Sequence, residues 1–334
     1  MADPAERILN ESVKHRIALG RYSNATVRKV LALLNRTEAS VIARLALATD
    51  NERSGAQLER LLEEIRALQD DGGLVLRSRL EGDLNALADA ERLFASRMVQ
   101  FGTREAGLGL ATNIPTTGQV VAAVNSRPFQ GRFLREWLAD AEAGAARRVR
   151  DTIRQGFVEG RGVSDMVRTI RGTRANGYRD GILEINRRGA EALVRTAITH
   201  TSAAASKATY EAMGVEEATY VAVLDSRTTI ICAGLNGKTF PLAKFPWPPR
   251  HVNCRSTVVP QVPGLEPVEP QSFDAWLRRQ PVEVQDDVLG VTRARLWRAG
   301  EIELDRFTDS AGNVLTLEEL QRRDAGAFER LGLD

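Results

Sequence analysis

Residues 194–225 read VRTAITHTSAAASKATYEAMGVEEATYVAVLD, and their periodicity changes at Gly214. Before this glycine the pattern predicts a helix over 190–213, whose run of alanine, serine and threonine would let a neighbouring backbone approach closely. After the glycine the sequence alternates as a strand does, and one face of this strand carries Tyr220, Ala222 and Leu224. The stretch therefore predicts a helix that leads directly into a small β-containing unit.

The predicted β-containing unit continues to about residue 262. β-Branched residues from Thr228 to Cys232 favour a second strand, and Asn236-Gly237 is a tight-turn signal before a further strand at Lys238–Phe240. Three prolines between positions 246 and 249 impose an irregular extended path. Residues Ser256 to Val259 then favour a closing strand.

The first two hundred residues read as helices, because apolar residues recur every three or four positions. Breaks are predicted at Asp70–Gly73 and across the Gly/Thr-rich stretch from Gly102 to Gln119. A long helix is predicted from Phe133 to Phe157. Ser164 is a good N-cap for the short helix that follows, and Gly172 is expected to close it.

The residues after the proline-rich linker at 260–270 are helical again in their apolar spacing. The predicted fold is therefore mainly α, with a small α+β module near 206–262 between a helical N-terminal body and a helical C-terminal tail. We expect three regions: a helical region at 1–120, a helical lead-in with the α+β module at 121–262, and the linker with the helical tail at 263–334.

The composition is that of an ordinary folded protein. The 334 residues are 43% hydrophobic and 27% charged, and the formal net charge of +2 does not indicate a dedicated nucleic-acid-binding protein. No apolar run approaches the ~20 residues that a membrane span needs, and the N-terminus has no apolar signal core. With only two cysteines the chain is not a disulfide scaffold, so we expect it to be made in a cytoplasm.

Charge is distributed unevenly along the chain. Residues 127–188 hold fourteen arginines against eight acidic residues, whereas residues 263–334 hold nine arginines against fifteen acidic residues. Solvated helix faces are the simplest explanation of such a pattern. The two regions could also attract each other, or face different partners in an assembly.

The candidate site residues lie between positions 225 and 254. A tetrahedral zinc could take its four ligands from Asp225, Cys232, His251 and Cys254. Such a metal would join two distant segments of a unit that has little core. No CxxC half is present, so a buried Cys232, an Asp225 paired with Arg227 and a His251 bonded to a loop carbonyl remain open. A Cys232–Cys254 disulfide is a further alternative in oxidising surroundings.

A cysteine and a histidine could also form a catalytic thiolate–imidazolium pair. Neither cysteine lies in a recognisable nucleophile motif, and neither a GxxxxGK[ST] phosphate loop nor an HExxH motif occurs. We therefore expect no catalytic residues and no enzymatic activity. The alternative is a hydrolase or toxin that uses Cys232 or Cys254 with His251.

Several motif residues of this region occur in a fixed order. They are an Arg-Thr pair in the helix, an Asp-x-Arg-Thr step after the aromatic strand, a cysteine, a glycine before a strand, and a closing Pro-Pro-x-His-x-x-Cys-Arg. Here these residues are Arg195, Thr196, Asp225, Arg227, Thr228, Cys232, Gly237, Phe240, Pro248, Pro249, His251, Cys254 and Arg255. From about 150 to 260 the chain resembles the Mu F-like minor head proteins of tailed bacteriophages, the phage head morphogenesis family. Ser256 departs from the resemblance, since many relatives have another cysteine there.

The resemblance implies a low-copy virion component that associates with the portal vertex and is packaged inside the procapsid. Such a minor capsid protein acts in head assembly, DNA packaging or DNA ejection. Its partners would be the portal protein and other head proteins, and region 127–188 could contact packaged DNA without sequence specificity. We expect a docking module that holds either no cofactor or one structural zinc. It would reside in the phage head, and in the host cytoplasm during assembly.

Overall fold

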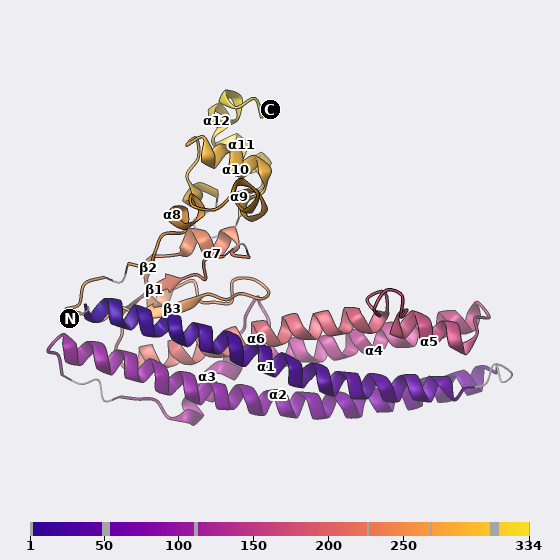
Figure 1. Cartoon of the computed structure of the whole chain (residues 1–334). Helices are drawn as coiled ribbons and strands as arrows, with labels where there is room; N and C mark the ends of the chain where they lie inside the picture. The colour runs from indigo at the N-terminus through magenta and orange to yellow at the C-terminus, as the bar shows by residue number, and fades with distance from the viewer. Residues whose placement is uncertain are drawn as a thin grey trace.

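The chain folds into a long helical body, a small sheet at one end of that body, and a group of short helices beyond the sheet (Figure 1). The computed structural model describes residues 3–48, 54–109, 113–225, 227–267, 269–307 and 314–333. The predicted fold class is confirmed, because the chain is mainly helical and carries a small β-containing module.

The helical body is arranged around α6 (Ile182–Ala212), which contacts every other helix of the body. Those helices are α1 (Pro4–Ala46), α2 (Gly55–Glu105), α3 (Thr117–Ser126), α4 (Leu134–Val158) and α5 (Val163–Arg171). α1 and α2 run side by side in opposite directions along the whole body (Figure 1). Small side chains of α6 are buried among these helices, including Ala197, Ala204 and Ala205. The predicted role of the small residues, to allow close approach, is confirmed.

The break predicted at Asp70–Gly73 is wrong, because α2 continues through these residues. Gly72 faces Thr37 of α1 so closely that an added Cβ would lie 2.1 Å from the Thr37 hydroxyl oxygen and 2.9 Å from its Cβ. Glycine therefore serves here as a contact point between two long helices. Packing along the hairpin outweighs the cost of a glycine within a helix, which is about 1 kcal/mol.

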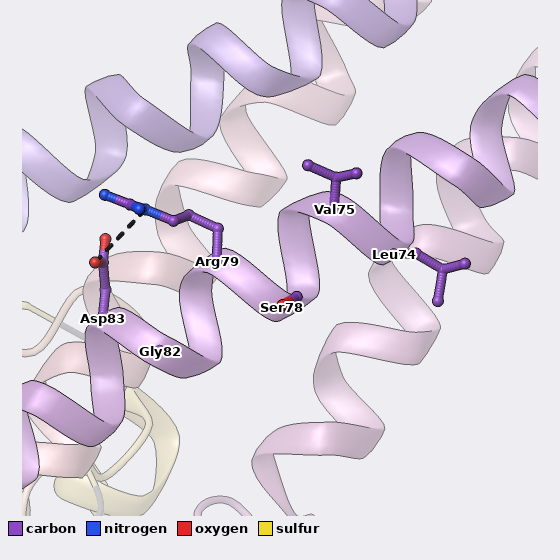
Figure 2. A pocket seen from close by; sticks show the side chains of 6 residues that line it. All are labelled: Leu74, Val75, Ser78, Arg79, Gly82 and Asp83. Atoms are coloured by element: carbon purple, nitrogen blue, oxygen red, sulfur yellow. Dashed lines mark ion pairs between the residues drawn. The ribbon is translucent and has the colours of Figure 1, made fainter.

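An exposed apolar pair lies on α2 beside these glycines. Leu74 is 61% exposed and Val75 is 58% exposed, and both border a shallow hollow along the helix (Figure 2). The hollow ends at Arg79 and Asp83, which form an ion pair at 3.7 Å one helical turn apart. Lys29 of α1 approaches the same Asp83 carboxylate at 3.4 Å. The hollow therefore borders the contact between α1 and α2.

The long connection predicted over 102–119 is present but shorter than expected. α2 continues to Glu105, so the first residues of the predicted loop are helical, and residues 110–112 lie outside the described part of the chain. Asn113 donates a hydrogen bond to the Ala212 carbonyl at 2.9 Å. This bond attaches the connection to the last turn of α6.

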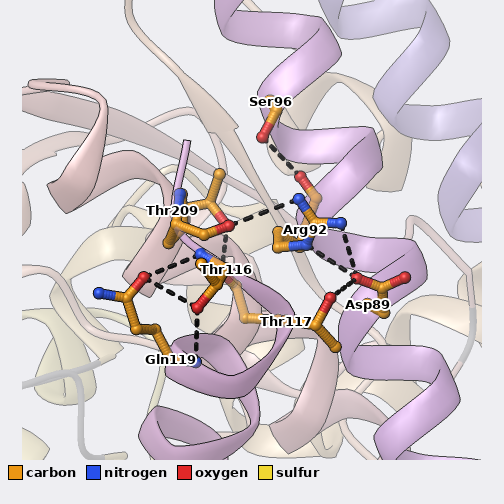
Figure 3. Close-up of polar contacts among 9 residues, drawn as sticks. Asp89, Arg92, Ser96, Thr116, Thr117, Gln119 and Thr209 are labelled. Atoms are coloured by element: carbon orange, nitrogen blue, oxygen red, sulfur yellow. Dashed lines mark hydrogen bonds and ion pairs between the residues drawn. The ribbon is translucent and has the colours of Figure 1, made fainter. Parts of the chain in front are cut away.

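Polar contacts at its first turn hold α3 against α2 (Figure 3). Thr116 and Gln119 form a capping box, in which each side chain bonds the backbone of the other. The Thr117 hydroxyl donates to Asp89 of α2 at 2.6 Å, and Arg92 Nε donates to the same oxygen at 2.8 Å. The hydrogen bonds from Thr117 and then Arg92 lower the pKa of Asp89.

The two helices that follow α3 agree with the prediction except at one cap. α4 begins and ends one residue later than expected, and Gly172 ends α5 with a φ of +91°. Ser164 is not the N-cap of α5, because the helix already begins at Val163 and Gly162 occupies the cap position.

The sheet has three short antiparallel strands in the order β2-β1-β3. The elements of this region are β1 (Glu217–Val221), β2 (Thr239–Pro241), the 3₁₀ turn η1 (Leu242–Lys244) and β3 (Thr257–Pro260). In the central strand, Thr219 lies opposite Thr239 and Val259. The predicted alternation is confirmed, since Tyr220 faces the core of the module whereas Val221 packs with residues of α1 on the opposite face.

The strand predicted at 228–232 is wrong, because these residues lead into a short helix, α7 (Ile230–Leu235). Thr229 caps it, accepting a hydrogen bond from the Cys232 backbone N–H at 3.4 Å. The inner side of α7 joins the module core, and Ala233 packs with the C-terminal helices. Packing on two sides overrides the strand preference of the β-branched residues.

The C-terminal tail is helical, as predicted, and forms an apolar cluster that includes α7. Its elements are α8 (Phe273–Leu277), α9 (Val282–Leu289), α10 (Val291–Arg298), η2 (Leu304–Phe307), α11 (Leu317–Arg323) and α12 (Ala325–Arg330). Trp297 is 1% exposed, and its indole N–H donates to Asp274 at 2.7 Å. Among the described residues, no helix has the length and apolar character needed to cross a membrane.

The contact at Gly72 predicts opposite effects for two glycine-to-alanine changes on the same helix. Gly72→Ala should lower the free energy of unfolding by about 1–3 kcal/mol, because a rotamer change of Thr37 cannot remove the contact with its Cβ. Gly82→Ala is the control, since an added Cβ there meets nothing within 4 Å. It should raise stability by roughly 0.5–1 kcal/mol. Urea unfolding of both variants measures the difference, and equal effects would contradict the close approach of the two helices.

Candidate functional site

Two cysteines and one histidine meet in the interior of the module. The ligand atoms of Cys232, His251 and Cys254 all lie within 4.8 Å of one another. Cys232 Sγ is 3.1 Å from His251 Nε2 and 3.8 Å from Cys254 Sγ, and both cysteines are free thiols. Cys232 is 3% exposed and Cys254 is 1% exposed, whereas His251 is half-buried. The structure thus brings together three of the four residues proposed from the sequence.

The loop that carries His251 and Cys254 is attached to α6 by two buried threonines. The Thr199 hydroxyl donates to the Cys254 carbonyl at 2.7 Å, and Thr196 Oγ1 accepts from the Asn253 backbone N–H at 3.0 Å. Thr196 belongs to the Arg-Thr pair of the motif, and its role is therefore to position this loop. The other member of the pair, Arg195, points outward to Glu191 and Asn24.

The aromatic ring of Tyr220 completes the surroundings of the two sulfurs. Its hydroxyl lies 3.2 Å from Cys232 Sγ and 4.0 Å from Cys254 Sγ. Tyr220 is fully buried, and burial raises the pKa of its hydroxyl well above the usual value. Sequence reasoning placed Tyr220 on a strand face but did not connect it with the cysteines. The short separation of Tyr220 and Cys232, 12 residues along the chain, is the sequence feature that could have suggested this contact.

The two thiols are not equivalent. The hydrogen bond from Cys232 and the neighbouring His251 lower the pKa of Cys254 well below the usual value of a thiol, although burial opposes this. The pKa of Cys232 is raised by its hydrogen bond with Cys254 and by burial. Burial lowers the pKa of His251, but the hydrogen bond and charge of Cys254 outweigh it, so the net direction is upward. In the metal-free site, Cys254 therefore loses its proton more readily than Cys232.

Asp225 does not join the cluster, because both of its carboxylate oxygens are bonded to Arg255. The two guanidinium nitrogens donate at 2.5 and 2.6 Å, whereas Arg227 approaches only to 3.6 Å. The Asp225 carboxylate also accepts from the Arg227 backbone N–H at 2.9 Å. The Arg255 hydrogen bond, against burial, lowers the pKa of Asp225. The Asp-x-Arg-Thr step and the final arginine of the motif thus form an ion-paired turn.

The remaining motif residues shape the chain around this turn. Thr228 donates its hydroxyl proton to the Val223 carbonyl and accepts from the Asp225 backbone N–H at 3.0 Å. Gly237 has a φ of +80° and donates its N–H to the Tyr220 carbonyl at 2.9 Å, which fixes the turn before β2. Pro248-Pro249 is a cis peptide in the loop before His251.

One polar residue of α1 supports the loop, and the sequence did not single it out. Arg16 of α1 donates to the Arg255 carbonyl at 2.6 Å. The adjacent His15 bonds the buried Glu91 carboxylate of α2 at 2.7 Å, and the Ser202 hydroxyl of α6 donates to the same carboxylate at 2.7 Å, so these residues join helices of the body and do not contact the loop. No motif marks these residues, because their partners lie on separate helices that only the folded body brings together.

The Asp225–Arg255 pair predicts a measurable contribution to stability. Asp225→Asn should lower the free energy of unfolding by about 1 kcal/mol at neutral pH, since the bidentate pair is two-thirds buried. The lowered pKa of Asp225 means that the native state holds its carboxylate charged more easily than the unfolded chain does. This stabilisation is therefore present above an unfolded pKa of roughly 3.9 and is lost as the pH falls below it.

Arg227→Ala is the matched control, because this side chain is 77% exposed and lies farther from the same carboxylate. Its effect on urea unfolding should stay within about 0.5 kcal/mol. Equal losses in the two variants would contradict the assignment of Arg255 as the main partner.

In a comparison with known protein families, the α+β module and the helices that lead into it match one family model. Residues 147–259, from the second half of α4 to β3, match the family model described as Phage Mu protein F like protein. No curated protein and no solved structure matches the chain. The matched range contains the thiol cluster, the Asp225–Arg255 pair and the threonines of α6 that hold the loop. The resemblance to the Mu F-like head morphogenesis proteins that the sequence predicted is therefore confirmed over residues 147–259, and this match supports a role in phage head morphogenesis.

Proposed function

We propose that this protein is a minor head protein of a tailed bacteriophage, located inside the capsid or at the portal, and that it acts by docking to other head proteins. The observation that carries the proposal is the family match over 147–259. The matched module lies where the helical body meets the tail, so its packing fixes two extended surfaces relative to each other (Figure 1). We propose that the protein acts in head assembly, DNA packaging or DNA ejection.

The burial of the thiol cluster supports docking rather than turnover. A cysteine hydrolase needs a nucleophilic sulfur that a substrate carbonyl can reach. Cys232 and Cys254 are at most 3% exposed, and both belong to the apolar core of the module together with Tyr220. The alternative, a hydrolase or toxin that uses either cysteine with His251, requires that the buried sulfur become exposed before each turnover.

The far end of the helical body offers a surface for a partner of negative charge. The loop after α5 carries exposed Arg174 and Arg179, and α5 lies at the end of the body farthest from the sheet (Figure 1). No acidic side chain among the described residues forms an ion pair with either arginine. The nearby Asp180 is bonded instead by Thr173 and Asn176. We propose that this end contacts packaged DNA or an acidic surface of the portal.

The composition of virions tests the head assignment. Particles of a phage that encodes this chain should contain the protein at a fixed low copy number relative to the portal protein, measured by quantitative mass spectrometry. Removal of its gene should leave synthesis of the major capsid protein unchanged. Counts of heads by electron microscopy, of nuclease-resistant genomes and of infectious particles then separate assembly, packaging and ejection. Absence of the protein from both procapsids and virions would refute the proposal.

Salt dependence tests the binding of DNA at the α5 end. Affinity of the purified protein for non-specific duplex DNA should fall as salt rises, with a logarithmic slope of about 0.9 for each phosphate that the protein neutralises. Arg174→Gln with Arg179→Gln should reduce both affinity and slope. Arg150→Gln with Arg188→Gln removes the same charge from arginines that are already paired with Asp151 and Glu184, and should have a smaller effect. Equal effects of the two double variants would overturn a specific role for this end.

A further inference from the structure

We propose that Cys232, His251 and Cys254 bind one Zn²⁺ ion, which joins α7 to the loop before β3. The inference is independent of the head assignment, because it depends only on the geometry and chemistry of the cluster. It also differs from the four-ligand site suggested by the sequence, because Asp225 is engaged by Arg255.

The spacing of the two sulfurs fits a shared metal. With Zn–S bonds of about 2.3 Å and tetrahedral angles, two thiolate ligands lie roughly 3.8 Å apart. Cys232 Sγ and Cys254 Sγ are 3.8 Å apart in the structure. The same geometry places an imidazole nitrogen roughly 3.6 Å from each sulfur, and His251 Nε2 lies 3.1 Å from Cys232 Sγ. The ligand atoms of His251 and Cys254 lie within 4.8 Å of each other, so a small movement of the half-buried ring away from Cys232 and toward Cys254 completes the ligand triangle.

The orientation of His251 also suits coordination. Its Nε2 points at the sulfurs, while Nδ1 lies 2.8 Å from the Val252 carbonyl oxygen. A proton on Nδ1 donated to that carbonyl leaves Nε2 with a free lone pair for the metal. Metal-binding histidines are commonly fixed in this way, by a hydrogen bond from the nitrogen that does not bind.

Charge balance favours zinc at this depth. Two thiolates and one divalent cation sum to zero, so the loaded site adds no net charge to a core in which both cysteines are almost fully buried. Softer sulfur ligands with one imidazole select zinc over magnesium or calcium, which prefer oxygen. The Tyr220 hydroxyl lies 3.2 and 4.0 Å from the two sulfurs, where it can donate a hydrogen bond to a thiolate ligand.

A disulfide fits the same residues less well. The sulfurs would have to close from 3.8 Å to about 2.05 Å, and His251 Nε2 would lose the thiol partner it now has. A metal instead uses all three side chains at once. It would also supply a strong cross-link to a sheet whose strands contain only five, three and four residues.

The experiment measures zinc in the purified full-length protein, produced under reducing conditions with zinc present. We expect one zinc per chain by elemental analysis, and loss of that zinc in Cys254→Ser and in His251→Gln. Two matched controls should keep the metal: His15→Gln, which changes a histidine outside the cluster, and Asp225→Asn, which changes the residue bonded to Arg255.

Measurements on the unchanged chain guard against variants that fail to fold. A chelator should lower the thermal unfolding temperature, and added zinc should restore it. Cobalt in place of zinc should give the near-ultraviolet thiolate-to-metal absorption of a two-sulfur site. The proposal is overturned if the folded, reduced protein binds no zinc, if Cys254→Ser retains it, or if Asp225→Asn loses it while remaining folded. A Cys232–Cys254 disulfide in protein from intact virions would likewise overturn it.

Discussion

The close packing around α6 is the constraint on which the rest of the structure depends. Because its buried face is rich in alanine, serine and threonine, five helices and β3 can all contact the same helix. Two of its threonines, Thr196 and Thr199, bond the loop that holds the candidate site. A larger side chain on this face would therefore disturb both the helical body and the position of the cysteines. The same helix, α6, therefore organises the helical body and positions the candidate site.

The elements predicted correctly are those in which local pattern and tertiary packing agree. The helix-to-strand change at Gly214 is an example, because glycine at a φ of +76° ends the helix just where the alternating apolar pattern begins. Two of the wrong predictions share a physical cause. Gly72 has poor helix propensity but is required by the contact with Thr37, and residues 228–232 favour strands but are packed on two sides as a helix. In both cases the deciding partner lies far away in the sequence.

The residues of the candidate site could be predicted from the sequence, but the contacts among them could not. Spacing alone suggested that Cys232, His251 and Cys254 belong together, and they do lie together. Spacing could not show that Arg255, next to a cysteine, reaches back to Asp225, nor that Tyr220 turns its hydroxyl toward the sulfurs. A carboxylate is a plausible zinc ligand and an equally good partner for arginine. Only the fold decides which of the two it becomes.

The module is better understood as a joint than as an independent domain. One face of its sheet packs against α1, while the other side builds a core with α2, α6 and α7, and α7 in turn carries the tail helices. The strands themselves supply few backbone hydrogen bonds, so the joint depends on side-chain attachments from several directions. These are the Asp225–Arg255 pair, the two threonines of α6, and the cluster of two sulfurs and an imidazole. Each attachment joins segments that are distant in sequence. In the docking role that we propose, this arrangement holds the body and the tail at a fixed angle, so that each can meet a different surface.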